Sequence, residues 1–332
     1  MKTSTIRRFI AAAAVAAMLT GCAAPAKQSE TSDVSTQSQA AASSAPAQEM
    51  TFTDALGYTV QLSSWDRVAS LYGSFAETWV LAGGSLVGAT VDAVEERGME
   101  LGDGVALLGS VKEPNLEEII AADPDFLILS ADIAAQVDMH DALTSAGIPH
   151  AYYRVDGVSD YLAMLEQFCQ MTGREDLYEE NGLAVQAEVG RVLEAVQDEP
   201  HPTVLLLRAF SSGAKAKGDD NLAGVILRDL GAENLVEKHE SLLEDVSLEE
   251  VIAADPDFIF VVTMGSSEEA ALDYMEQNFE SNPAWAELTA VQEDHYVLLP
   301  KELFHYKPNA RWGESYAYLA KILYPELAAE IG

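Results

Sequence analysis

The chain has 332 residues, and its 54 Asp and Glu residues against 19 Lys and Arg give a formal net charge of −35. A surface this acidic argues against binding of nucleic acid or of anionic membranes by the bulk surface, because both carry dense negative charge. The length suits more than one hydrophobic core. With 2 cysteines, a framework of several disulfides is excluded.

The first 21 residues predict an export signal. Basic residues near the start precede an apolar run, 9–19, that is too short to span a bilayer comfortably. The run ends in Leu19-Thr20-Gly21-Cys22, which looks like a bacterial lipobox and implies cleavage before Cys22 and lipid attachment to its thiol. An ordinary secretory signal with a chance cysteine is the alternative. Once Cys22 is lipidated, only Cys169 remains, and we expect it to be a small core residue.

Residues 22–49 read as a disordered tether. Ala, Ser, Thr, Gln and Pro make up almost all of the stretch, and Val34 is its one large apolar residue. Such a segment cannot bury a core. The remainder predicts an N-terminal α/β lobe over 50–157, connecting helices over 158–198 and a C-terminal α/β lobe over 199–332.

The N-terminal lobe predicts alternating short strands and helices. Residues 51–60 alternate apolar and polar around Gly57, which is typical of a β-hairpin. A strand over 68–71 breaks at Tyr72-Gly73-Ser74, and a helix over 75–81 follows it. Further short elements lie at 87–90 and 147–152. This alternation favours a small doubly wound sheet.

An eleven-residue segment occurs twice, at 116–126 and at 248–258, with ten identities between the copies. In each copy, apolar residues at i, i+3 and i+4 predict a helix with one buried stripe. Pro124 and Pro256 end these helices, and a continuous apolar run typical of a buried parallel strand follows each. We interpret the Glu and Asp residues of the repeat as helix-start and turn residues rather than as catalytic carboxylates.

Two helices are expected between the lobes, over 160–171 and over 176–196. The second would run roughly 32 Å, long enough to bridge two lobes. The C-terminal lobe opens with a strand at 203–207 and contains a helix over 222–230 that Gly231 caps. A last strand over 295–300 and a closing helix over 312–324 follow the second copy of the repeat.

This order of elements resembles the class III substrate-binding proteins of ABC importers, which carry ferric siderophores, haem or cobalamin. The resemblance rests on the lipobox, the tether, a Phe-x-Asp-x-x-Gly hairpin (Phe52, Asp54, Gly57), the duplicated unit and the long connecting helix. It implies two Rossmann-like α/β lobes joined by one helix, a ligand cleft between the lobes, and delivery of the ligand to a membrane permease and its ATPase. It also implies an extracytoplasmic, lipid-anchored monomer that makes and breaks no bond, so that no catalytic residue, resident cofactor or metal is expected.

Members of that family carry one docking glutamate on each lobe, which pairs with arginines of the permease. Glu77, seven residues before Gly84, matches the first. Counting back seven from Gly231 gives Gly224, so the second glutamate is missing. Three aspartates are candidate substitutes for it, Asp219, Asp220 and Asp229.

Ligand-facing residues are expected where the parallel strands reach their carboxyl ends. Six of the 19 Lys and Arg residues lie within 208–217 and 301–311, which suggests an anionic ligand; solvated loop lysines are the alternative. Tyr306 and His305 add groups that stack on or ligate a metal chelate. The predicted ligand residues are Tyr72, Lys112, Arg208, Lys217, His305, Tyr306, Lys307 and Arg311. Trp79 and Trp312 are expected in the core.

Several ligands stay open. The basic segments favour a ferric siderophore over cobalamin, and haem remains an alternative because His305 or Tyr306 could serve as an axial ligand. A naked zinc or manganese ion is a further alternative, although the histidines are scattered along the chain. An enzyme on paired α/β lobes is the alternative from a different class, but a Walker-type loop, a nucleophile elbow and cysteine ligands for a cluster are absent from the sequence.

Overall fold

The computed structural model describes residues 49–332, except residues 245 and 266, and these belong to one compact unit. The predicted signal segment, Cys22 and all of the predicted tether but Glu49 lie outside the described residues. Within the described part, no helix combines the length and the apolar character needed to cross a membrane.

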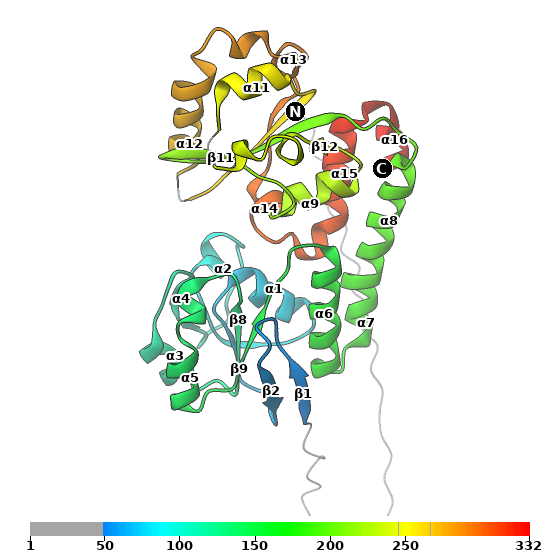
Figure 1. The fold of residues 1–332 in the computed structure, drawn as a ribbon. Coiled ribbons are helices and arrows are strands. Elements are labelled where there is room, and N and C mark those ends of the chain that lie inside the picture. The colour runs from blue at the N-terminus through cyan, green and yellow to red at the C-terminus, as the bar shows by residue number, and fades with distance from the viewer. Residues whose placement is uncertain (1–48, 245, 266) are drawn as a thin grey trace, which may run out of the picture. The chain divides into compact units, whose positions relative to one another are not determined.

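The N-terminal lobe, in which Figure 1 labels β8 and β9, is built on a parallel sheet. The strand order of this sheet is β5-β4-β3-β8-β9. Its strands are β3 (Val68–Ser70), β4 (Leu86–Ala89), β5 (Ala106–Leu107), β8 (Phe126–Ser130) and β9 (His150–Tyr153). Its helices are α1 (Gly73–Leu81), α2 (Asp92–Glu95), α3 (Leu116–Ala122), α4 (Ala134–Val137) and α5 (His140–Ala146). A two-residue hairpin, β6 (Gly109–Ser110) and β7 (Glu113–Pro114), follows β5.

Helices cover both faces of this sheet, which explains why β8 is apolar at every position but its last. Phe126 and Ile128 pack with the α1 side of the lobe, whereas Leu127 and Leu129 pack with residues of α3 and α5. All five residues of β8 are buried. A strand of a parallel sheet covered on both faces has this pattern.

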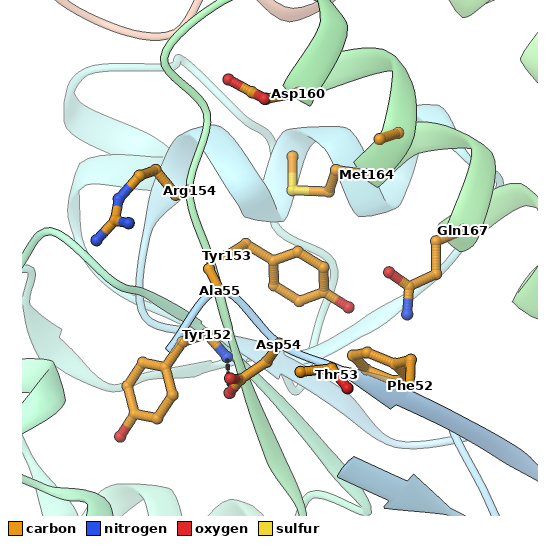
Figure 2. A pocket seen from close by; sticks show the side chains of 11 residues that line it. Phe52, Thr53, Asp54, Ala55, Tyr152, Tyr153, Arg154, Asp160, Met164 and Gln167 are labelled. Atoms are coloured by element: carbon orange, nitrogen blue, oxygen red, sulfur yellow. Dashed lines mark hydrogen bonds between the residues drawn. The ribbon is translucent and has the colours of Figure 1, made fainter. Parts of the chain in front are cut away.

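The predicted hairpin forms from β1 (Met50–Thr53) and β2 (Thr59–Leu62), and Asp54 fixes its turn. The Asp54 carboxylate accepts hydrogen bonds from the backbone N–H groups of Leu56 (3.0 Å) and Tyr58 (2.9 Å). It also accepts one from Tyr152 N in β9 at 3.1 Å, drawn as the dashed line in Figure 2. Gly57 completes the turn with φ 88°, a left-handed value that glycine adopts without strain. The Phe-x-Asp-x-x-Gly motif therefore joins the hairpin to the edge of the first sheet.

The two copies of the repeat fold alike, as α3 with β8 and as α11 (Leu248–Ala254) with β13 (Phe258–Thr263). Asp123 and Asp255 end the two helices in the left-handed conformation, with φ of 48° and 42°. Asp125 accepts from the backbone N–H of Arg67 (2.9 Å), just before β3, and Asp257 accepts from Thr203 N (2.7 Å), at the start of β10 (Thr203–Phe210). The repeated acidic residues that make these contacts are structural, as predicted.

The connection between the lobes is helical from α6 (Val158–Thr172) to α8 (Ala184–Val196), apart from a turn at Gly173. The predicted helix over 176–196 is continuous, but it contains a π-helical turn, Glu179–Leu183, between α7 (Glu175–Tyr178) and α8. There the carbonyl of Asn181 accepts from Tyr161 Oη at 2.7 Å. Single π turns of this kind bend helices at defined places.

The C-terminal lobe has the strand order β11-β10-β13-β14, and β12 (Glu233–Asn234) pairs with the start of β10. Its other strands are β11 (Gly213–Ala216) and β14 (Tyr296–Leu298). Its helices are α9 (Leu222–Asp229), α10 (Ser241–Glu244), α11, α12 (Glu268–Met275), α13 (Thr289–Gln292), α14 (Lys301–Phe304), α15 (Trp312–Leu323) and α16 (Ala328–Ile331). Single turns at Leu235–Glu237, Trp285–Glu287, Asn309–Arg311 and Pro325–Leu327 are 3-10 helical, and Glu276–Glu280 is a π turn. The prediction of two α/β lobes joined by a long helix is confirmed.

Both basic segments are more regular than predicted. Strand β10 continues through Arg208 and turns back into β11, so that Arg208 pairs with Lys215 in an antiparallel hairpin rather than lying in a loop. The start of the second segment is helix α14, and a 3-10 turn begins at Asn309. Trp79, Trp312 and Cys169 are buried, as expected.

Candidate ligand-binding site

The segment 301–311 of the C-terminal lobe contacts the N-terminal lobe directly. The Lys307 ammonium donates to the carbonyl of Val155, which lies between β9 and α6. Asn309 Nδ2 donates to the carbonyl of Ser74 at 2.9 Å and to Glu77 Oε2 at 2.6 Å, both in α1. Asn309 is 1 % exposed and has φ 53°, a left-handed backbone that costs energy for a residue other than glycine. The surrounding contacts hold this strained residue in place.

His305, immediately after α14, lies within electrostatic reach of four basic side chains from both lobes. We define these residues, Lys112, Arg208, Lys301, His305 and Lys307, as the cationic cluster. Burial, together with the positive charges of Lys301, Arg208, Lys307 and Lys112, lowers the pKa of His305 to about 4. The imidazole is therefore neutral at pH 7. Burial also lowers the pKa of Lys307.

Residues that belong to the cluster come from distant parts of the sequence for a topological reason. Lys112 lies in the turn between β6 and β7, and Arg208 lies near the carboxyl end of β10. Lys301 begins α14, directly after the strand β14. Ligands of open α/β sheets bind at the carboxyl ends of strands, and this is the edge at which the cluster forms.

Tyrosines and acidic groups lie beside the cluster. Burial raises the pKa of Tyr72 to about 12, and the negative charges of Asp92 and Glu96 act in the same direction. Burial raises the pKa of Tyr306 as well, and Glu96 adds to this effect across the lobes. The pKa of Glu96 is itself raised by burial, against the opposing charge of Lys301. Tyr72 and Tyr306 are thus both neutral hydroxyl groups near the same pair of acids.

Two of the predicted ligand residues are engaged in ion pairs. Lys217 pairs with Asp220, and Arg311 pairs with Glu314 at 2.6 Å. A pocket of about 730 Å³ adjoins Arg208, and Lys215 and Lys217 also line it. The basic residues of 208–217 therefore line a hollow next to the cluster.

Sequence reasoning missed four residues of this region: Glu96, Arg97, Lys301 and Asn309. Lys301 belonged to the basic segment but was not singled out. Glu96 and Arg97 follow α2, after the carboxyl end of β4, and the same strand-end rule applied to β4 would have found them. For Asn309 we find no signal in the sequence, because its role depends on contacts with α1.

Glu77, the predicted docking residue, is already paired within the protein. Its carboxylate forms an ion pair with Arg97 and accepts the hydrogen bond from Asn309, and its side chain is 30 % exposed. The Arg97 side chain is 8 % exposed. A partner arginine that approached Glu77 would compete with both groups.

The position without a docking glutamate, Gly224, has no room for a side chain. A Cβ atom there would lie 1.9 Å from the carbonyl oxygen of Gly218. The candidate substitutes are all in ion pairs: Asp219 and Asp229 with Arg228, and Asp220 with Lys217. Asp229 also accepts from Tyr316 Oη at 2.6 Å.

A smaller hollow of about 180 Å³ lies away from the cluster, between the hairpin and α6 (Figure 2). The ring of Tyr153 projects into it, and burial raises the pKa of this tyrosine. Its hydroxyl is buried and, among the described residues, has no hydrogen-bond partner. Asp54, which also lines this hollow, is occupied by backbone N–H groups.

Comparison with known proteins gives consistent matches. The model of the family described as "Periplasmic binding protein" matches residues 68–303. The High-affinity heme uptake system protein IsdE of Staphylococcus aureus is 20 % identical over 221 residues, which cover 66 % of this chain and 74 % of that protein.

Among solved structures, SirA of Staphylococcus aureus complexed with staphyloferrin B has a TM-score of 0.62 at 21 % identity, over 84 % of this chain and 98 % of SirA. An ABC transporter substrate-binding protein from Listeria monocytogenes EGD-e has a TM-score of 0.65 at 18 % identity, over 78 % of this chain and 98 % of that one. These structural likenesses agree with the two-lobe fold. The family match covers most of the chain, so this protein belongs to the periplasmic binding protein family.

Proposed function

We propose that this protein captures an anionic metal chelate, a ferric siderophore in the first place, and delivers it to an ABC permease and its ATPase. The cationic cluster around His305 carries this proposal. In a chain with a net charge of −35, four Lys and Arg side chains gather near one imidazole and lower its pKa. Such a concentration of positive charge raises the local concentration of an anion and favours its binding.

The tyrosines support a chelate rather than a simple anion. Tyr72 and Tyr306 present aromatic rings and neutral hydroxyl groups near the cluster. An aromatic ring stacks on the flat face of a catecholate or a porphyrin, while the ammonium groups meet its anionic oxygens. SirA, whose solved structure contains staphyloferrin B, has a related fold.

Haem is the second candidate, and the state of His305 favours it. An iron ligand must be a neutral imidazole, and the low pKa keeps His305 neutral at physiological pH. IsdE is a haem uptake protein. The positive charges nearby would then meet the haem propionates.

We further propose that Cys22 carries a lipid that holds the protein, as a monomer, on the extracytoplasmic face of the membrane, and that Glu77 docks the permease. The sequence Leu19-Thr20-Gly21-Cys22 supports lipidation of Cys22. The C-terminal lobe has Gly224 where a second docking glutamate is expected, which supports docking that depends on the N-terminal lobe. Replacement of Cys22 by alanine should release the protein from the membrane fraction, and Glu77→Lys should abolish uptake while ligand binding persists.

The ligand is tested by titrating the purified protein with a ferric catecholate, a ferric hydroxamate, haem and cobalamin, and following tryptophan fluorescence and the Soret band. For an anionic iron chelate, Lys112→Ala and Arg208→Ala should each weaken binding roughly tenfold, because each removes one charge that meets the ligand. Lys238→Ala is the matched control, since Lys238 pairs with Glu233 at the surface of the same lobe as Arg208.

The outcomes separate the candidates. Equal affinity of the three variants would show that the ligand does not bind at the cluster. A haem Soret shift that disappears in His305→Ala, with no binding of the siderophores, would identify a haem carrier. Saturable cobalamin binding alone would exclude both iron chelates.

A further inference from the structure

Two histidines on the outer side of the N-terminal lobe form a pair that the proposed ligand site does not use. His140 begins α5 and His150 begins β9 (Figure 1). His150 Nε2 lies 3.0 Å from His140 Nδ1. A pocket of about 410 Å³ adjoins both side chains.

The hydrogen bonds define which nitrogen of His150 carries a proton. Its Nδ1 lies 2.8 Å from the carbonyl oxygen of Ile148, which can only accept, so Nδ1 donates there. In the neutral ring, Nε2 then has a free lone pair and accepts from Nδ1–H of His140. Metal-binding histidines have this arrangement: the second nitrogen donates to a backbone carbonyl, which fixes the tautomer and the ring.

The surroundings hold the rings and leave space next to them. Tyr58 stacks on His140, with ring centroids 4.0 Å apart and planes within 12°. Water molecules in the adjoining pocket have room to complete the coordination of an ion.

The two nitrogens lie 3.0 Å apart, so one ion at metal–nitrogen distances of about 2.0–2.1 Å can reach both after a small rotation of a ring. Cu(II) binds nitrogen ligands more strongly than the other divalent ions of its row.

We propose that His140 and His150 form a surface site for a late divalent transition metal, with preference for Cu(II). The ion replaces the proton of His140 Nδ1, and the His140 side chain turns so that its lone pair points at the ion. Among the residues the structure describes, no group of three or more His, Cys, Asp or Glu side chains is arranged around a metal position. The site is therefore a two-histidine site completed by water. It shares no residue with the cationic cluster.

The test is titration of the untagged, full-length protein with Cu(II) and with Zn(II), by calorimetry and electron paramagnetic resonance. We expect one Cu(II) per chain, a spectrum split by two imidazole nitrogens, and at least tenfold weaker binding of Zn(II). His140→Ala and His150→Gln should each remove this binding. His239→Ala, which removes a half-buried histidine elsewhere in the chain, should leave it unchanged.

Circular dichroism shows whether each variant is folded. If His150→Gln unfolds, His140→Ala alone tests the metal site, because His140 is half-buried at the start of a surface helix. Copper binding that persists in folded His140→Ala overturns the proposal, as does a spectrum without two nitrogen ligands. Siderophore and haem binding are measured in the same variants. Loss of copper with intact chelate binding confirms that the two sites are separate, and a failure of the chelate proposal leaves the copper result unaffected.

Discussion

At the scale of single residues, His305 has the most perturbed environment of the proposed ligand site. Its pKa, lowered to about 4 by burial and by four positive charges, lies below the value of about 6.5 expected in the unfolded chain. Between these two pH values the unfolded state binds a proton that the folded state does not. The folded protein therefore loses stability through His305 as the pH falls, and regains it as the pH rises above about 6.5.

We expect the free energy of unfolding to depend less on pH in His305→Gln than in the wild type. The contribution of His305 is at most about 3 kcal/mol between pH 7 and pH 4. Urea unfolding of both proteins at pH 7 and at pH 4.5 measures this contribution. The carboxylates are the same in both proteins, so their effect cancels when the two changes in the free energy of unfolding are subtracted. Identical pH dependence would mean that His305 is not desolvated in the folded state.

The surroundings of His305 show how much of the proposed ligand site could be predicted from the sequence. A concentration of Lys and Arg in 208–217 and 301–311 was visible, and the structure brings Arg208, Lys301 and Lys307 near His305. Lys217 and Arg311 were indistinguishable from these in the sequence, yet each pairs with an acid three residues away. Whether a basic side chain is free or neutralised depends on local geometry, which composition does not contain.

At the scale of elements, Gly224 explains why the two lobes differ in their first helices. The backbone of 218–219 crosses α9 so closely that a methyl group at residue 224 would overlap the carbonyl of Gly218. A docking glutamate in the C-terminal lobe would require a different path for that backbone. The asymmetry predicted from the sequence therefore has a steric cause.

Gly224→Ala should destabilise the protein by roughly 2–4 kcal/mol, because the backbone that it meets must shift. Gly190→Ala is the matched control, since Gly190 lies in α8 and a methyl group there would meet no atom of another part of the chain within 4 Å. Alanine at this position should stabilise the helix by about 0.5–1 kcal/mol. Thermal unfolding of both variants tests this, and equal melting temperatures would contradict it.

The repeat makes a second prediction at this scale. Asp125 accepts from Asp66 N (3.0 Å) and Arg67 N (2.9 Å) and from the hydroxyl of Ser64, ahead of β3. Asp125→Ala should lower the free energy of unfolding by about 1–3 kcal/mol, because it leaves these groups without their partner. Asp103→Ala, at an exposed loop position, is the control for loss of one negative charge. If urea unfolding shows the same change in both variants, the repeat's acid has no structural role.

Elements with a strong local signal were predicted well, and those fixed by distant contacts were not. The hairpin, the duplicated helix and strand, and the connecting helix all follow from periodicity and turn residues. The π turn at Glu179–Leu183 was not predicted, because it depends on the Tyr161 hydroxyl that binds Asn181 O. The β10–β11 hairpin was missed as well. The apolar run 203–207 stops at Arg208, and Lys215 lies in the partner strand, so the sequence pattern suggested a loop at both positions.

At the scale of the whole molecule, the contacts of Asn309 and Lys307 join the two lobes in this structure. Glu77 is one of the acceptors, so the proposed docking residue is also part of the contact between the lobes. An arginine of a permease that took over Glu77 would remove one hydrogen bond of Asn309. If Glu77 docks the permease as proposed, docking and separation of the lobes would be linked through this carboxylate.

Asn309→Gly should shift the protein towards separated lobes. Glycine adopts the left-handed backbone of this position without strain, so the substitution removes only the two side-chain hydrogen bonds, one of them to a charged acceptor. We expect the ratio of separated to joined lobes to rise roughly tenfold or more.

Fluorescence energy transfer between dyes on the two lobes measures this ratio. The control, Asp294→Gly, relieves another left-handed residue (φ 60°) that makes no contact between the lobes among the hydrogen bonds described. Unchanged transfer in Asn309→Gly would mean that other contacts determine the position of the lobes.

The parallel pairing inside each lobe has a consequence for how a newly made chain folds. Val204 in β10 pairs with Phe258 in β13, and the sheet cannot form until the helices between them have been synthesised and folded back. Sheets of this kind form slowly, because distant segments must meet before any pairing is rewarded. The fully buried strands β8 and β13 would be exposed until then. If the first 21 residues act as the proposed export signal, slow folding would favour the extended form that a translocation channel accepts, and the apolar strands would be the segments that a chaperone has to protect.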